Sequence, residues 1–118
     1  EQLRALNQEL NDSELRTRLA QIGLDANQVN QTCAQLSGGE RVKAAMACVL
    51  YAQQPAQLLL LDEPANHLDL PSIRALESML QQYRGTLIVT SHDEAFVDAI
   101  GITHRLEAST SGWLNISV

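Results

Sequence analysis

Apolar residues recur along this chain with two different spacings, which divide it into helices and strands. Between residues 38 and 53 they fall three or four positions apart, as they do on one face of a helix. The stretches 58–61 and 86–90 are instead apolar or β-branched throughout, as expected of strands covered on both faces in a parallel sheet. A helix between them, with Pro71 in its first turn and Gly85 at its end, completes a strand–helix–strand unit that should be parallel and right-handed.

The same patterns predict shorter elements toward both ends of the chain. Ser13 can cap a helix that ends at Gly23. Beyond the second strand we expect a short helix over 93–100, a strand over 103–108 and a closing edge strand over 113–118. Two longer helices should bury one face each: Val42, Ala45, Met46, Val49 and Leu50 in the first, and Ile73, Leu76, Leu80 and Tyr83 in the second.

These elements predict an α/β chain in two parts. Residues 1–54 should form a helical portion, and residues 55–118 a mostly parallel sheet with flanking helices. The chain has 118 residues, of which 45% are hydrophobic, so it can build a globular core within the size of one small domain. Aromatic residues make up only 3%, so that core must consist mainly of aliphatic side chains.

Charge and cysteine content exclude several classes of function. The net charge is −6 and the eight basic residues are scattered, which is a poor basis for holding nucleic acid through its phosphates. Cys33 and Cys48 lack metal-binding or redox spacing, so we expect two free thiols. No apolar run approaches the roughly 20 residues that span a membrane. We therefore expect a cytoplasmic protein without direct membrane contact.

Two carboxylates, Asp62 and Glu63, directly follow the first strand. The carboxyl end of a parallel strand is where open α/β sheets place their ligands. An aspartate there can hold Mg²⁺, usually through water, while the next acid can orient an attacking water or accept its proton. The alternative is a carboxylate pair that only caps the following turn. The neighbouring motifs favour the chemical interpretation.

Ser37, Gly38 and Gly39 precede a helix, and Glu40 completes a capping-box pattern with Ser37. Glycines leave the first backbone N–H groups open, and the helix N-terminus adds positive partial charge, so the segment could bind an anion. A simple N-cap is the alternative. Both can hold, because a capping serine still has a hydroxyl proton to donate.

His92 follows the second strand and should therefore stand at the same sheet edge as Glu63. A histidine there could hydrogen-bond a phosphate oxygen or an attacking water. The alternative is a strand-end histidine satisfied by the backbone. The other two histidines are weaker candidates for a functional role: His67 should order a loop, and His104 should be a surface or sheet residue.

Four motifs occur in a characteristic order: LSGGE over 36–40, LLLLDE over 58–63, NHLD over 66–69, and His92. Together they resemble the C-terminal portion of an ABC-type ATPase nucleotide-binding domain, with signature, Walker B, D-loop and switch histidine. The match covers roughly residues 13–108, and the sequence around the D-loop is most like that of the F subfamily of ABC proteins.

The resemblance implies a partial P-loop NTPase fold, with a helical subdomain remnant and with the Walker A half missing. The phosphate-binding loop needs the pattern G-x-x-x-x-G-K-[ST]. The single lysine of this chain, Lys43, follows Val42 instead of glycine. We therefore expect the missing N-terminal half of the domain to grip the phosphates, and the chain alone to bind ATP very weakly without turning it over.

The resemblance also implies a catalytic group at the sheet edge. Glu63 would be the catalytic base of ATP hydrolysis, His92 would contact the γ-phosphate, and Asp62 would help to hold Mg²⁺ through water. ATP and Mg²⁺ are thus the expected substrate and metal.

A second group would serve another nucleotide. Ser37, Gly38, Gly39 and Glu40 would bind ATP held on a second ABC domain, because the family sandwiches nucleotide between two head-to-tail domains. Asp69, in the D-loop, would bridge the two halves of that sandwich.

Proteins of the F subfamily are soluble, carry two ATPase domains in one chain and act on the ribosome or in related regulation. We accordingly expect the ribosome as a possible partner of the intact protein. The strands over 58–61 and 86–91 should leave apolar surface and unpaired edges without the missing half, so we also expect the chain to self-associate.

Three other interpretations remain open at this point. The chain could be a piece of a membrane transporter's ATPase subunit, although the Asn66-His67 pair favours the F subfamily. It could be a non-catalytic interaction fragment that presents its signature helix to another domain. It could belong to an SMC-type or repair ATPase, since these share a signature and Walker B lobe. Such proteins usually lack this D-loop sequence, and a long coiled coil should precede their signature.

Overall fold

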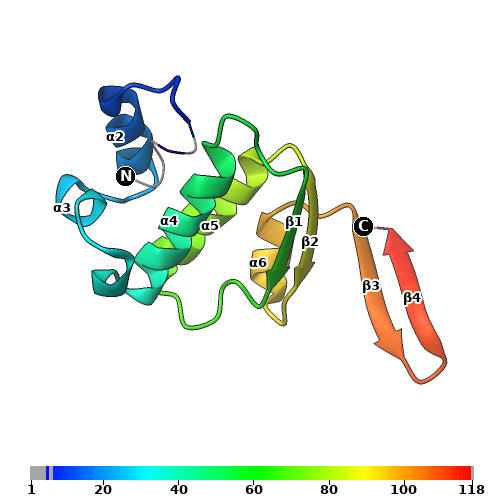
Figure 1. The fold of residues 1–118 in the computed structure, drawn as a ribbon. Coiled ribbons are helices and arrows are strands. Elements are labelled where there is room, and N and C mark those ends of the chain that lie inside the picture. Colours follow the sequence, from blue (N-terminus) through cyan, green and yellow to red (C-terminus); the bar gives the residue numbers. More distant parts are fainter. Residues whose placement is uncertain (1–4, 6, 118) are drawn as a thin grey trace.

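The computed structural model describes residue 5 and residues 7–117. It consists of helices on one side of a small parallel sheet, and of a separate two-stranded hairpin (Figure 1). The expected strand over 113–118 ends at Val118, which lies outside the described residues. In chain order the elements are α2 (Asp12–Gln21), α3 (Ala26–Val29), the 3-10 helix η1 (Cys33–Gln35), α4 (Gly38–Leu50), β1 (Leu58–Asp62), α5 (Leu70–Gln82), β2 (Thr86–Thr90), α6 (Glu94–Ala99), β3 (His104–Ser109) and β4 (Gly112–Ser117).

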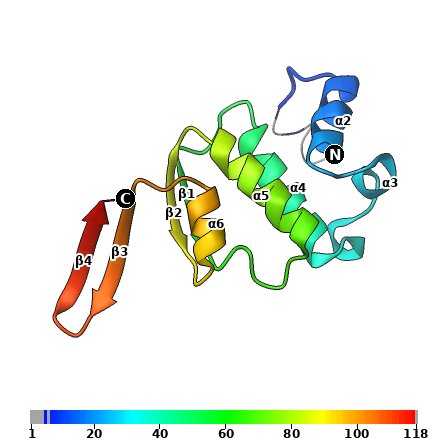
Figure 2. The same cartoon turned by 180° about the vertical axis from the view of Figure 1, so that it is seen from behind.

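The first sheet confirms the predicted parallel pair. β1 and β2 run in register from Leu58 opposite Thr86 to Asp62 opposite Thr90, and α5 forms the crossover between them. Helices α5 and α6 lie on one side of this sheet, as the two opposite views agree (Figures 1 and 2).

The expectation that both faces of these strands are covered is wrong, whereas the expectation that they leave apolar surface exposed is confirmed. Exposed and half-buried residues alternate along β1 and β2. Leu60 is 65% exposed and its cross-strand partner Ile88 is 55% exposed. The described chain has no element that packs on this face, so an apolar strip remains open to solvent.

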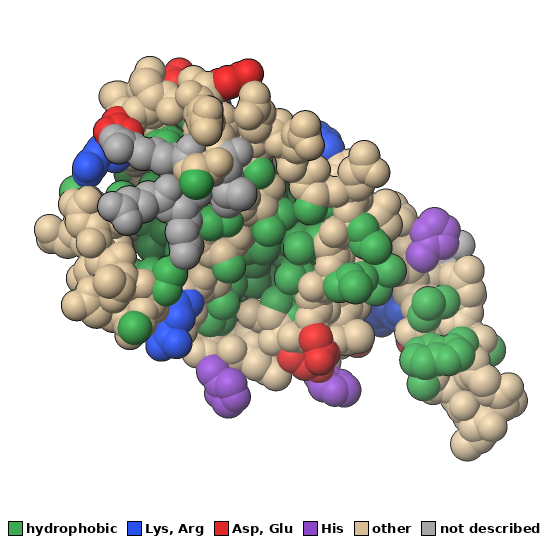
Figure 3. Space-filling model, in the orientation of Figure 1, with side chains coloured by type: hydrophobic (Ala, Val, Ile, Leu, Met, Phe, Trp, Pro, Cys, Tyr) green, Lys and Arg blue, Asp and Glu red, His purple; other side chains and the backbone are tan. Residues whose placement is uncertain are grey.

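The second sheet is a separate antiparallel hairpin. β3 and β4 pair from His104 opposite Ser117 to Ser109 opposite Gly112, and they join no other strand of the described chain. The closing strands therefore do not extend the parallel sheet as expected. The hairpin projects from the body of the molecule, and hydrophobic side chains gather on it, including Trp113 at 74% exposure (Figure 3).

The core lies where α4 and α5 pack together and α6 packs against α5. Phe96, Leu76 and Met79 are its largest fully buried side chains. Further core members come from the helical portion, the loop after β1, α5 and the end of α6: Leu19, Ile22, Leu24, Met46, Ala47, Ala65, Leu80 and Ile100. The core thus joins elements from both parts of the chain.

The helix ends differ from the predicted ones in two places. Asn11, rather than Ser13, caps α2, because its side chain accepts from the backbone N–H of Glu14 at 2.9 Å. Helix α4 ends at Leu50, earlier than residue 53.

The buried faces also need correction. In α4 the buried positions are Lys43, Met46 and Ala47, whereas the expected core residue Ala45 is exposed. Tyr83 is half-buried at the end of α5, and its hydroxyl donates to the carbonyl of Ala56 at 2.6 Å. Among the described residues, no helix is long and apolar enough to cross a membrane.

Candidate functional site

The two acids expected to carry chemistry lie where β1 ends. Asp62 is the last residue of β1 and stands opposite Thr90, the last residue of β2. The Thr90 hydroxyl donates a hydrogen bond to Oδ1 of Asp62. This contact fixes the carboxylate at the sheet edge and leaves Oδ2 free of any hydrogen bond within the described chain.

Glu63 takes a backbone conformation that non-glycine residues rarely adopt. Its φ is 45°, in the left-handed region. Its N–H donates to the carbonyl of Thr90 at 2.9 Å, so the residue is anchored to β2 as the chain turns away from the sheet. Such strain costs about 1–3 kcal/mol and is often found at functional sites. The side chain of Glu63 reaches His92, just beyond the end of β2.

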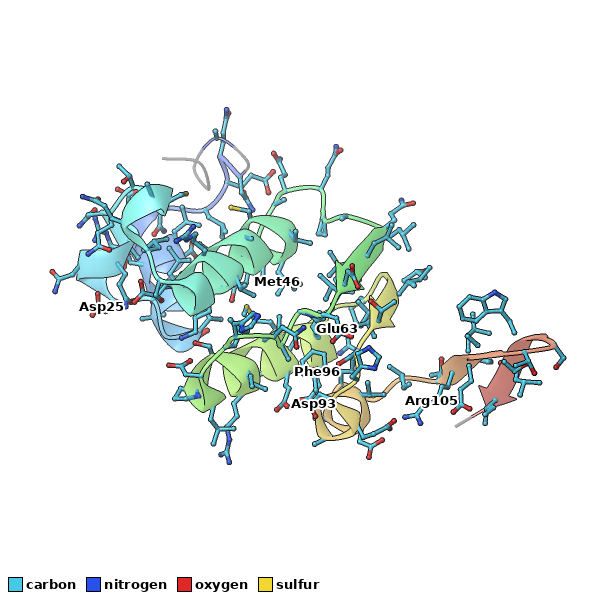
Figure 4. The ribbon with its side chains drawn as sticks, turned by 90° about the horizontal axis from the view of Figure 1, so that it is seen from below. Asp25, Met46, Glu63, Asp93, Phe96 and Arg105 are labelled. Atoms are coloured by element: carbon cyan, nitrogen blue, oxygen red, sulfur yellow. The ribbon has the colours of Figure 1, made fainter. Side chains whose placement is uncertain are left out.

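His92 and Glu63 meet as the sequence predicts. The backbone N–H of His92 donates to Oε2 of Glu63 at 3.3 Å, and Nε2 of its ring lies 3.3 Å from Oε1. The Glu63 side chain is 26% exposed and that of His92 is 98% exposed. Figure 4 shows Glu63 beside the start of α6, near Asp93 and Phe96. The carboxylate is therefore held in place, while the imidazole faces solvent.

The start of α4 forms a complete capping box. Oγ of Ser37 accepts from the N–H of Glu40 at 3.2 Å, and Oε2 of Glu40 accepts from the N–H of Ser37 at 2.8 Å. Gln28 donates to Oε1 of Glu40 at 2.6 Å. Ser37 and Gly38 are exposed, and no atom lies within 4 Å of where a Gly38 side chain would begin. The simple N-cap interpretation holds, and the open first turn leaves room for an anion as well.

Gly39 brings α4 into close contact with the start of α5. A Cβ at Gly39 would lie 2.4 Å from Oγ and 3.0 Å from Cβ of Ser72, and 3.8 Å from Oδ1 of Asp69. Asp69 caps α5 by accepting from the N–H of Ser72 at 3.1 Å. Hydrogen bonds from the Ser72 side chain and backbone lower the pKa of Asp69 below its ordinary value, and Lys43 adds a smaller effect in the same direction.

The predicted residues thus form two groups. Asp62, Glu63 and His92 meet at the sheet edge, whereas the start of α4 meets Asp69. The loop from Glu63 to Asp69 connects the two groups along the chain. His67, inside this loop, has a φ of 61°, and its expected role in ordering the loop stays a prediction.

Three contacts of these groups were not predicted. Thr90 holds Asp62, Gln28 holds Glu40, and Ser72 holds Asp69. Thr90 could have been found from the strand register, and Ser72 from its place three residues after the capping aspartate. Nothing in the sequence indicates the Gln28 contact, because it depends on how α3 packs beside α4.

The donor set limits the kind of metal that could bind. The described residues contain no group of three or more His, Cys, Asp or Glu side chains arranged for a metal. Mg²⁺ fits this arrangement, because it commonly uses one or two carboxylates and takes its other ligands from water and substrate phosphates. Asp62, held by Thr90 through one oxygen only, can supply such a carboxylate.

The chain has a mixed α/β fold with a parallel sheet, as the family model that matches it also indicates. A profile described as "AAA domain, putative AbiEii toxin, Type IV TA system" matches residues 6–98. Because this match covers most of the chain, the protein belongs to that family of ATPase domains.

Relatives narrow the resemblance to the F type of ABC protein. The putative ATP-binding protein YdiF of Bacillus subtilis is 42% identical over 102 residues, which are 86% of this chain and 15% of YdiF. The ABC transporter F family member 2 of Arabidopsis thaliana is 39% identical over the same shares of both chains. The ribosome protection protein VmlR of Bacillus subtilis is 48% identical over 67% of this chain and 13% of its own length. The chain therefore spans about 15% of the length of the curated relatives that it matches.

Proposed function

We propose that this chain is the C-terminal part of an ATP-hydrolysing ABC domain of an F-type protein. The contact between Glu63 and His92, at 3.3 Å across the ends of two parallel strands, carries this proposal. It places a candidate base and a candidate phosphate-binding group next to each other. This is the edge at which open α/β sheets bind their ligands.

Glu63 would orient the attacking water and accept its proton. Its carboxylate is held by the N–H of His92, so it is positioned before substrate arrives. A positioned general base typically contributes about 10²–10⁴ in rate. His92, with its ring exposed, would contact the γ-phosphate or the water.

Asp62 would hold Mg²⁺, through water, with its free carboxylate oxygen. When bound, the metal would bridge phosphate oxygens of ATP and neutralise developing charge. Thr90 would keep Asp62 in place by its hydrogen bond.

The start of α4 would act on a nucleotide held by a second ABC domain. Ser37, Gly38 and Gly39 would offer a hydroxyl and open N–H groups to its γ-phosphate, and Glu40 would stabilise the turn through the capping box. Asp69 would bridge the two domains in a head-to-tail sandwich. The support is the exposed first turn of α4 beside the capped start of α5.

The intact protein would need more than this chain supplies. The N-terminal half of the domain would contribute the phosphate-binding loop, and the division at residues 54 and 55 would separate a helical subdomain from the ATPase core. The name of VmlR refers to ribosome protection, and we extend to this protein the proposal of a ribosomal partner in the cytoplasm. Without its other half, this chain would not hydrolyse ATP.

An ATPase assay on the chain, alone and mixed with an N-terminal half that carries the phosphate-binding loop, tests the proposal. We expect turnover only in the mixture, and its loss with Glu63→Gln by about 10²–10⁴-fold. Glu107→Gln, an exposed acid on the hairpin, is the matched control and should retain activity. Equal turnover of the two variants would refute the role of Glu63, and turnover by the chain alone would refute its dependence on the other half.

A further inference from the structure

A side-chain contact joins the capping boxes of two successive helices, α3 and α4. At the start of α3, the N–H of the N-cap residue Asp25 donates to Oε1 of Gln28 at 2.8 Å. At the start of α4, the N–H of the N-cap residue Ser37 donates to Oε2 of Glu40 at 2.8 Å. Nε2 of Gln28 in turn donates to Oε1 of Glu40 at 2.6 Å. A continuous chain of hydrogen bonds therefore runs from the N-cap of α3 to the N-cap of α4.

The amide of Gln28 uses both of its ends in this chain of hydrogen bonds, because its oxygen accepts and its nitrogen donates. A glutamate at position 28 would still complete the capping box of α3, since glutamate and glutamine both suit that place. An ionised carboxylate has no proton to donate, however, and it would face the carboxylate of Glu40 with the same charge. The contact between the two helices thus requires the amide, whereas the capping of α3 does not.

This contact occupies the second oxygen of the Glu40 carboxylate. Oε2 accepts from Ser37 and Oε1 accepts from Gln28, so both oxygens are held. The N–H groups of Gly38 and Gly39 make no hydrogen bond within the described part of the chain. A carboxylate is favoured at a helix N-terminus, so a Glu40 side chain released from Gln28 would be drawn toward these N–H groups. Holding it to one side keeps the first turn of α4 open to another anion.

We propose that Gln28 is a positioning residue, which couples α3 to the first turn of α4 by holding the side chain of Glu40. Helix α3 has four residues and none of them is buried, so apolar packing alone fixes it weakly beside α4. A displacement of α3 would therefore reach Ser37 through Gln28 and Glu40. The consequence for hydrolysis rests on the function proposed above, whereas the coupling itself is a property of this chain and needs no nucleotide.

Exchanging the two side chains tests the coupling by NMR spectroscopy of the chain alone. In Gln28→Glu, repulsion should displace Glu40, and the Ser37 N–H should exchange with water about two- to tenfold faster after correction for global stability. The double variant Gln28→Glu/Glu40→Gln has the composition and net charge of the wild type, and it re-forms the contact with the donor on the other side. Its Ser37 N–H should exchange at least about twofold more slowly than in Gln28→Glu.

Gln35→Glu is the matched control. Gln35 occupies the same capping-box position at the start of η1, where its Oε1 accepts from the N–H of Thr32 at 3.0 Å. It donates no hydrogen bond to another element of the described chain. The substitution adds the same charge only two residues from Ser37 and should leave the exchange of its N–H unchanged. Equal acceleration in Gln35→Glu, or no recovery in the double variant, overturns the proposal.

Two further measurements complete the test. If Gln28→Glu does not fold, Gln28→Met, which keeps the length of the side chain without its hydrogen bonds, takes its place with the same expected acceleration. In the wild-type chain, absence of an Overhauser contact between the side-chain amide protons of Gln28 and the γ-protons of Glu40 would also overturn the coupling.

The consequence for hydrolysis is measured in the mixture with the N-terminal half. Gln28→Glu should lower turnover by about two- to tenfold, and the double variant should restore it, while Gln35→Glu keeps it. Unchanged turnover in Gln28→Glu would overturn this consequence. Absence of turnover in every variant and in the wild type would contradict the proposed function instead, and the exchange rates would still decide the coupling.

Discussion

The two glycines at the start of α4 should respond in opposite ways to the same substitution. Gly38 and Gly39 are adjacent, both belong to the first turn, and neither has a positive φ. A Cβ at Gly38 would meet no atom within 4 Å, whereas a Cβ at Gly39 would lie 2.4 Å from Oγ of Ser72 and 3.0 Å from its Cβ. Only the second substitution forces α4 and α5 apart.

The magnitudes follow from two opposing effects. Alanine is favoured over glycine in a helix by up to about 1 kcal/mol. Overpacking of a closely packed contact costs about 1–3 kcal/mol. Gly38→Ala should therefore stabilise slightly or have no effect, and Gly39→Ala should be less stable than Gly38→Ala by about 1–3 kcal/mol. The hydroxyl of Ser72 could rotate away, but only by losing its hydrogen bond to Asp69.

Urea unfolding of both variants, followed by circular dichroism, measures this difference directly. The double variant Gly39→Ala/Ser72→Ala removes the closest atom and should recover part of the loss. Equal stability of the two single variants would refute the close contact between α4 and α5. A double variant no better than Gly39→Ala would show that the hydroxyl is not the obstacle.

Three further predictions concern the core, the D-loop and the open sheet face. Phe96→Ala should lower the free energy of unfolding by about 3–5 kcal/mol in the same assay, because Phe96 is fully buried; a loss below about 1 kcal/mol would contradict its place in the core. Because the pKa of Asp69 is lowered on folding, the ionised carboxylate stabilises the fold fully above its ordinary pKa, and this stabilisation is lost as the pH falls below that value. The difference in free energy of unfolding between wild type and Asp69→Asn should therefore shrink below about pH 4. A difference that stays constant with pH would contradict the lowered pKa. Light scattering should show that the chain self-associates at micromolar concentration. Leu60→Lys, on the open face of the sheet, should reduce this self-association more than Gln54→Lys, at another exposed position. A monodisperse wild-type monomer would disprove the self-association.

Local chemistry made part of the candidate site predictable. The spacing of Ser37 and Glu40 predicts their capping box, which needs only hydrogen bonds within one turn. The placement of Glu63 and His92 after two parallel strands predicts that they meet, because parallel strands end at one edge. The first prediction holds because both groups lie in one helical turn, and the second because a strand–helix–strand unit brings the ends of its two parallel strands to one edge.

Tertiary packing decided which residues and which faces of the strands are buried. Ala45 and Lys43 fit a helical pattern equally well by position, yet the structure exposes the alanine and buries the lysine. The apolar runs of β1 and β2 predict strands covered on both faces, but a cover on one face requires an element that the described chain does not provide.

The sequence by itself determined most of the helices and strands and the capping box of α4, since these depend on residues a few positions apart. Only the tertiary structure decided which faces are buried, how closely Gly39 approaches Ser72 and what surrounds Lys43. Those features depend on contacts between segments far apart in the chain, and hydrophobic patterning does not specify which segments meet.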